Sequence, residues 1–128
     1  MQCRAIDRNC EEFDLDKVAE DRGYTGKRAD VLCICGSVAI VIEETSGKAK
    51  KEDVEKLLAS LSFLKEKGVL PTYVKLILCV LHHGEGLYKG VAEELRRRDL
   101  KRRCKPISAN CDHDLMTKLR MAWELSRR

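Results

Sequence analysis

The sequence predicts a single α/β domain spanning 1–128, with a mixed β-sheet and helices on both faces. The chain has 128 residues, which is enough for one hydrophobic core but not for two. Two β-branched runs resemble a hairpin over about 28–45, and helix-like and strand-like segments then alternate to the C-terminus. That order is typical of a mixed sheet covered by helices. The run 73–82 is almost continuously apolar, as expected of a strand buried on both faces.

The first half of the chain contains a short helix and then the hairpin. Asp14 suits the N-cap of a helix that carries Leu15, Val18 and Ala19 inward, because its carboxylate can accept a hydrogen bond from the first turn. Residues 28–45 follow as two strands. Gly36-Ser37 lies between them, and a two-residue turn of this kind favours glycine at its first position.

The second half alternates between helices and strands. Leucine and valine recur at helical spacing over 51–67, which predicts an amphipathic helix. The buried strand 73–82 comes next. A second helix is expected over 87–98, a short strand over 104–108 and a last helix over 112–126.

The hairpin register brings two carboxylates together. With the turn at Gly36-Ser37, Asp30 lies directly opposite Glu43, with the two Cβ atoms about 5 Å apart on one face. Two like charges so placed repel each other. A divalent cation between them would remove the repulsion, and carboxylate oxygens suit Mg²⁺ or Mn²⁺. The alternative interpretation is that both residues only mark the hydrated ends of their strands.

These residues also resemble a known family. Ala29-Asp30 opens one strand and Ile42-Glu43-Glu44-Thr45-Ser46 ends the next, which resembles the PD-(D/E)XK nuclease superfamily and, within it, the archaeal Holliday-junction resolvases. The resemblance covers roughly residues 12–110. It implies a restriction-endonuclease-like fold and a Mg²⁺- or Mn²⁺-dependent endonuclease that hydrolyses phosphodiester bonds of DNA. It also implies Asp30 and Glu43 as metal ligands, with the main-chain carbonyl of Glu44 as a third.

The chain departs from the family pattern at one catalytic position. Thr45 stands where the family has its catalytic lysine, and a hydroxyl carries no charge to stabilise a developing phosphate anion. Arg28, the expected cross-strand neighbour of Thr45, and Lys48 in the following loop are candidates for that charge. The alternative is a catalytically inactive nuclease-fold module that binds DNA or a protein partner. An additional acidic ligand, common in the family, falls to Glu12 or Glu20.

Charge is distributed unevenly along the chain. The net charge of +4 combines +6 over 89–128 with −2 over 1–88. A dense basic run is either a solvated helix end or a contact surface for a phosphate backbone. Aromatic residues make up only 5% of the chain, which disfavours base-stacking platforms for single strands and favours duplex or branched DNA. The basic run consists of Arg96, Arg97, Arg98, Lys101, Arg102, Arg103 and Lys105.

The seven cysteines fall into two groups. Cys33, Cys35 and Cys79 lie in apolar strand-like runs and are predicted to be small buried side chains. The other four lie in polar segments, in two pairs of equal spacing that do not match common zinc sites. The alternatives for these four are a disulfide that ties the two ends of the chain together, or an iron–sulfur or zinc site with His113. Besides an active nuclease and an inactive nuclease-fold module, a small cysteine-based metal or redox protein is therefore a third functional class. These four are Cys3, Cys10, Cys104 and Cys111.

The composition of the chain indicates where in the cell the protein is expected and which partners it is expected to have. No apolar run reaches the roughly 18 residues of a membrane span, and the N-terminus lacks the apolar stretch of a secretory signal, so a cytoplasmic protein without a membrane partner is expected. Abundant Lys, Glu and Arg, with one Gln and two Asn, are thermophile-like. Met121, Trp123 and Leu125 spread over more than one face of the last helix, which leaves room for a homodimer interface.

Overall fold

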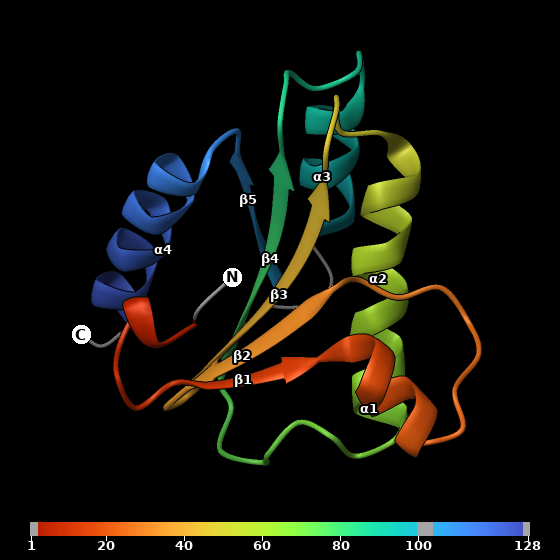
Figure 1. The fold of residues 1–128 in the computed structure, drawn as a ribbon, viewed down its shortest axis with the longest axis vertical. Coiled ribbons are helices and arrows are strands. Elements are labelled where there is room, and N and C mark those ends of the chain that lie inside the picture. Colours follow the sequence, from red (N-terminus) through yellow and green to blue (C-terminus); the bar gives the residue numbers. More distant parts are fainter. Residues whose placement is uncertain (1–2, 100–103, 127–128) are drawn as a thin grey trace.

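A five-stranded mixed sheet runs through the molecule in the order β1-β2-β3-β4-β5 (Figure 1). The computed structural model describes residues 3–99 and 104–126. The first three strands pair antiparallel, and β3, β4 and β5 pair parallel. The strands are β1 (Glu11–Asp14), β2 (Val31–Cys35), β3 (Val38–Thr45), β4 (Leu76–His83) and β5 (Cys104–Ala109).

Helices cover both faces of this sheet, as predicted. One face packs against α1, α2 and α3, and the other against α4 and the short 3₁₀ helix η1 (Figure 1). Alternate residues of β3 divide between the two cores: Ala39 and Val41 join the first, while Ile40 and Ile42 join the second. The helices are η1 (Cys3–Ala5), α1 (Leu15–Asp21), α2 (Lys51–Glu66), α3 (Val91–Asp99) and α4 (Asp112–Ser126).

The predicted hairpin and its register are confirmed. Cys35 pairs with Val38 across a turn in which Gly36 has φ +63°, a backbone conformation that glycine adopts at little steric cost. The Asp30 N–H donates to the Ile42 carbonyl at 3.0 Å. The β2–β3 pairing therefore brings Asp30 beside Glu43, the arrangement that the turn position predicts.

Several expected boundaries were wrong. Strand β1 was not predicted, because Glu11–Asp14 has no apolar alternation. The strand expected over 73–82 is Leu76–His83, and the helix expected over 87–98 begins only at Val91. Leu87 instead forms a bridge with Ala49, so the chain is held extended before α3 begins.

The cysteine predictions are corrected by two disulfides. Cys3 is bonded to Cys33, and Cys10 to Cys35. Cys33 and Cys35 are buried but not unpaired, and Cys79 is also disulfide-bonded. Cys3 and Cys10 therefore tie the N-terminal segment to β2 rather than to the C-terminal end. Cys111 is a free, exposed thiol, and the side chain of Cys104 lies outside the described part of the chain.

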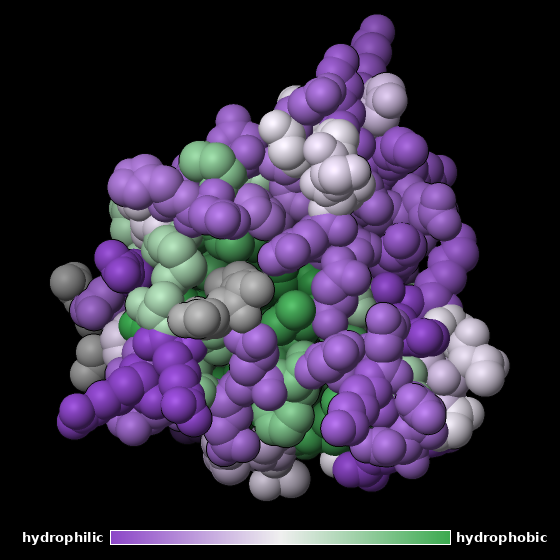
Figure 2. All heavy atoms as spheres, viewed as in Figure 1, coloured by the Kyte–Doolittle hydropathy of each residue, from purple (hydrophilic) through white to green (hydrophobic). Residues whose placement is uncertain are grey.

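The face of the molecule drawn in Figure 2 is largely hydrophilic. Figure 2 shows polar residues over most of one face, with hydrophobic atoms visible near its centre, over the strands. None of the described helices is long and apolar enough to cross a membrane. On α4, Trp123 packs against the core while Met121 and Leu125 are exposed, and a homodimer interface on this helix stays a prediction.

Candidate metal centre

The sheet brings Asp30 and Glu43 into contact. Asp30 immediately precedes β2 and is exposed, whereas Glu43 lies near the end of β3 with only 2% of its surface exposed. The Glu43 carboxyl is hydrogen-bonded to Asp30. Asp30 Oδ2 also accepts a hydrogen bond of 2.8 Å from the Glu44 N–H. The pair therefore has one buried and one solvent-facing carboxyl.

Burial dominates the electrostatics of the pair. Burial is the largest of the causes that raise the pKa of Glu43 to about 9, and the hydrogen bond and negative charge of Asp30 contribute to the same rise, because burial and a neighbouring carboxylate both disfavour a charge on Glu43. Lys56 opposes this effect, since its Nζ lies 3.7 Å from Glu43 Oε2. Among the described residues, Glu43 Oε2 is a buried oxygen without a hydrogen-bond partner.

Helix α2 holds the chain in place beside the pair. The buried Ala29 N–H donates to Ser60 Oγ at 2.6 Å, and the Ser60 hydroxyl donates to the Lys56 carbonyl at 2.9 Å. This contact fixes the backbone just before Asp30. The same helix places Lys56 next to Glu43.

Sequence reasoning missed the contribution of α2. Asp53 is 6% exposed, and its charge also acts on Glu43, while its Oδ2 accepts from the Lys50 N–H at 2.8 Å. Asp53, Lys56 and Ser60 follow one another at intervals of three and four residues. Residues at such intervals share a helix face. The signal available in the sequence was this polar stripe, which lies beside the apolar stripe of the same helix.

The expected substitutes for the missing lysine lie elsewhere. Because β2 begins at Val31, the predicted pairing of Arg28 with Thr45 is absent from the β2–β3 ladder. The Arg28 guanidinium instead binds Asp16 Oδ1 at 2.8 Å. Thr45 pairs with His83 of β4. Lys48 Nζ lies 5.7 Å from the centroid of the Tyr88 ring.

Neither expected acidic ligand is shown beside the pair. Glu12 lies on β1 opposite Cys33, and its Oε1 accepts from the Cys3 N–H at 2.8 Å. Cys33 belongs to the core on the opposite face from the one that contacts α2. Glu20 is an exposed residue of α1.

The Glu44 side chain lines a separate cavity of about 560 Å³, together with His82 and Asp112. His82 Nε2 lies 3.0 Å from Asp112 Oδ1, and His83 Nε2 lies 3.0 Å from Ser108 Oγ. The two histidines therefore have separate partners.

The basic run is only partly described. Arg96, Arg97 and Arg98 are exposed residues of α3, and Lys105 is an exposed residue of β5. Arg97 and Arg98 both form ion pairs with Glu94 on their own helix. The predicted contacts of Lys101, Arg102 and Arg103 lie outside the described residues.

Two groups of metal-ligating side chains in the described chain bear on the predicted metal sites. Ligand atoms of Cys3, Glu12 and Cys33 lie within 4.8 Å of one another, but the Cys3–Cys33 disulfide leaves no thiolate for a metal. Asp30 and Glu43 instead offer carboxylate oxygens, the donors that Mg²⁺ and Mn²⁺ prefer. The unsatisfied Glu43 Oε2 is an oxygen that a cation would satisfy.

These features were compared with those of known proteins. No family model, no curated protein and no solved structure matches this chain.

Proposed function

We propose that this protein is a metal-dependent endonuclease of restriction-endonuclease-like fold that hydrolyses phosphodiester bonds in duplex or branched DNA. The observation that carries the proposal is the contact between Asp30 and the buried Glu43, which has an oxygen without a hydrogen-bond partner among the described residues. Two carboxyls in contact in a partly buried site suit a bridging hard cation. The position of the pair, with Asp30 just before β2 and Glu43 on β3, agrees with the PD-(D/E)XK pattern.

Asp30 and Glu43 would hold Mg²⁺ or Mn²⁺. When bound, such an ion supplies Lewis-acid polarisation of a phosphate oxygen and a more acidic water. The exposed Asp30 is accessible to a phosphate from solvent, and the buried Glu43 anchors the site in the sheet. Lys56 supplies a positive charge, 3.7 Å from Glu43 Oε2, that Thr45 does not.

The test measures Mn²⁺ binding calorimetrically, and in parallel the cleavage of a labelled duplex and a labelled four-way junction. Asp30→Asn and Glu43→Gln are each expected to weaken Mn²⁺ binding at least tenfold and to reduce cleavage at least a hundredfold. Glu66→Gln removes one exposed charge at the far end of α2 and serves as the matched control. Unchanged cleavage by either site variant would contradict the proposed site.

Variants of Lys56 distinguish the active endonuclease from the catalytically inactive module. The neutral Thr45 beside His83 favours a protein that binds without cutting, whereas the Lys56–Glu43 contact favours catalysis. Lys56→Met is expected to reduce cleavage at least tenfold and to leave duplex binding in EDTA within twofold, with partial rescue by Lys56→Arg. Duplex binding without cleavage in either Mg²⁺ or Mn²⁺ would identify the inactive module.

A further inference from the structure

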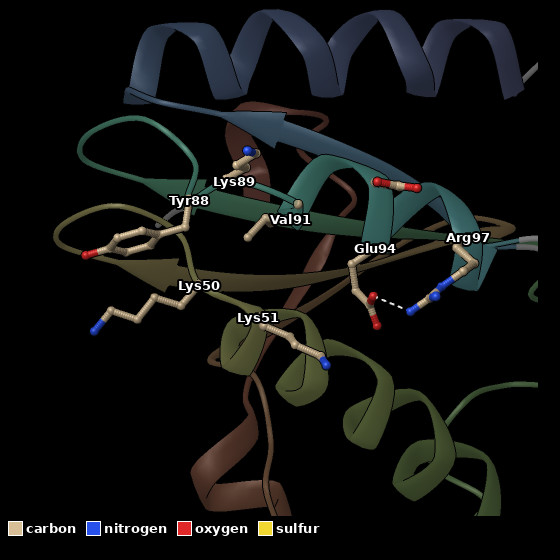
Figure 3. Close-up of a pocket in the computed structure, with 9 residues that line it drawn as sticks. Lys50, Lys51, Tyr88, Lys89, Val91, Glu94 and Arg97 are labelled. Carbon is tan, nitrogen blue, oxygen red and sulfur yellow. Dashed lines mark hydrogen bonds and ion pairs between the residues drawn. The ribbon is translucent and has the colours of Figure 1, made fainter.

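A second candidate binding feature lies between the first turns of α2 and α3. A cavity of about 670 Å³ opens there, and Lys50 and Lys51 line it from α2 and the residue before it. Lys89 and Arg97 line it from the side of α3. In Figure 3, Lys51 and Arg97 reach toward the space between the two helices, each from its own helix.

The cavity has an excess of positive charge. Its four cationic side chains are accompanied by two carboxylates, Glu93 and Glu94. Glu94 is already paired with Arg97 and Arg98; the Arg98 hydrogen bond is the main reason that the pKa of Glu94 is lowered. Lys50, Lys51 and Lys89 form no ion pair with any other described residue. Lys51 acts electrostatically on Glu55, and Lys50 and Lys89 carry charge that no ion pair with a described residue neutralises.

Two further features favour an anionic occupant. Helices α2 and α3 both begin at the cavity, at Lys51 and Val91, and the first turn of a helix carries partial positive charge. Tyr88 is 50% exposed at the cavity rim, and Lys48 lies over its ring. Lys48 thus adds a fifth cation beside the cavity.

The cavity is connected to the carboxylate pair through α2. Asp53, two residues after Lys51, acts on the charge of Glu43, and Lys56 contacts Glu43 directly. Five residues separate Lys51 from Lys56, which is a rise of about 7.5 Å along the helix. The cavity and the carboxylate pair therefore lie against successive turns of the same helix.

We infer that this cavity, the α2–α3 cavity, binds a backbone phosphate of the same nucleic acid whose scissile phosphate lies at Asp30 and Glu43. This inference rests on the proposed function for the identity of the strand. It assigns the contact to Lys50, Lys51 and Lys89, which lie outside the 96–105 run that the sequence predicted. Such contacts position a duplex without reading its sequence.

The test measures the affinity of a fluorescein-labelled 20-base-pair duplex by anisotropy in EDTA, so that binding is separated from cleavage. Lys51→Glu/Lys89→Glu is expected to weaken binding at least tenfold in about 0.1 M salt, and to lower the slope of log affinity against log salt by about two. Lys51→Gln/Lys89→Gln should give an intermediate loss. Circular dichroism verifies that each variant is folded.

The matched control reverses two charges elsewhere. Lys65→Glu/Lys75→Glu changes the net charge equally, but Lys65 lies about 21 Å along α2 from Lys51 and Lys75 precedes the amino end of β4. The control should stay within twofold of wild type. Equal losses in both double variants, no loss in the cavity variants, or no duplex binding by wild type would each overturn the inference.

Three further outcomes separate the cavity from related proposals. Calorimetric binding of AMP that the cavity variants abolish, with duplex affinity unchanged, would assign the cavity to a free nucleotide and overturn the inference. Duplex binding lost in the cavity variants, with no cleavage by wild type in any metal, would contradict the endonuclease and support the cavity. Normal cleavage by wild type, with unchanged duplex binding by the cavity variants, would support the endonuclease and contradict the phosphate contact at the cavity.

Discussion

Glu43 keeps its proton at a pH at which an exposed glutamate would have lost it. Burial is the largest cause, and the neighbouring Asp30 adds to it. The remaining charges near the group belong to α2, where Lys56 lowers the pKa and Asp53 raises it. The pKa of about 9 in the folded protein thus stands well above the ordinary value of 4.5.

This shift predicts how the stability of the metal-free protein depends on pH. Between about pH 4.5 and pH 9 the folded state holds a proton on Glu43 that the unfolded state has released. The free energy of unfolding therefore falls as pH rises through this window. In urea denaturation, Glu43→Gln is expected to remove this contribution, on the order of a few kcal/mol between pH 5 and pH 9.

The control for this prediction is Glu66→Gln, which removes an exposed carboxyl from the same protein. It should keep the wild-type dependence on pH. A free energy of unfolding that falls from pH 5 to pH 9 by as much in Glu43→Gln as in the wild type would contradict the raised pKa.

The residues of the candidate site differ in how far the sequence could predict them. Asp30 and Glu43 are paired by a local hairpin, so the position of Gly36 alone places them opposite each other. Lys56 reaches Glu43 only because α2 packs on that face of the sheet. Spacing along the chain contains no information about that packing. Arg28, which the sequence offered for the same role, binds Asp16 in the structure.

Among the elements, those with a strong internal pattern were predicted most closely. The helix over 51–67 and the last helix over 112–126 agree with α2 and α4 within one residue, because their apolar residues recur at helical spacing. Strand β1 has no such pattern, and its pairing with β2 is supported by disulfides to the segment before it. The start of α3 depends on the distant contact between Leu87 and Ala49.

The contact between α2 and the chain entering β2 yields a second prediction. Ser60 is fully buried and accepts the Ala29 N–H. Ser60→Ala would leave that N–H buried without its partner, which costs about 1–3 kcal/mol. Chemical denaturation is expected to show this loss, together with weaker Mn²⁺ binding because Asp30 follows directly. The exposed Ser46→Ala is the matched control for stability, and an equally small effect in both variants would contradict the role of Ser60.

At the scale of the whole molecule, the two cores depend on different kinds of contact. The face beneath α1, α2 and α3 is closed by three helices with apolar side chains. The face beneath α4 is closed in part by the N-terminal segment, where Cys3, Ile6 and Cys10 pack against the sheet. That segment includes only the single turn η1, so the Cys3–Cys33 and Cys10–Cys35 bonds do much to hold it in place.

These crosslinks predict a large and specific loss of stability when they are removed. The two bonds join cysteines 30 and 25 residues apart, and a loop of that size restricts the unfolded chain by about 3–4 kcal/mol for each bond. Cys3→Ala/Cys33→Ala is therefore expected to lose about that amount in guanidinium denaturation, and Cys10→Ala/Cys35→Ala a similar amount. Cys111→Ser changes an exposed free thiol and should leave the midpoint unchanged. If the double variants matched Cys111→Ser, the N-terminal segment would be held by packing alone, since losing both crosslinks would then cost nothing.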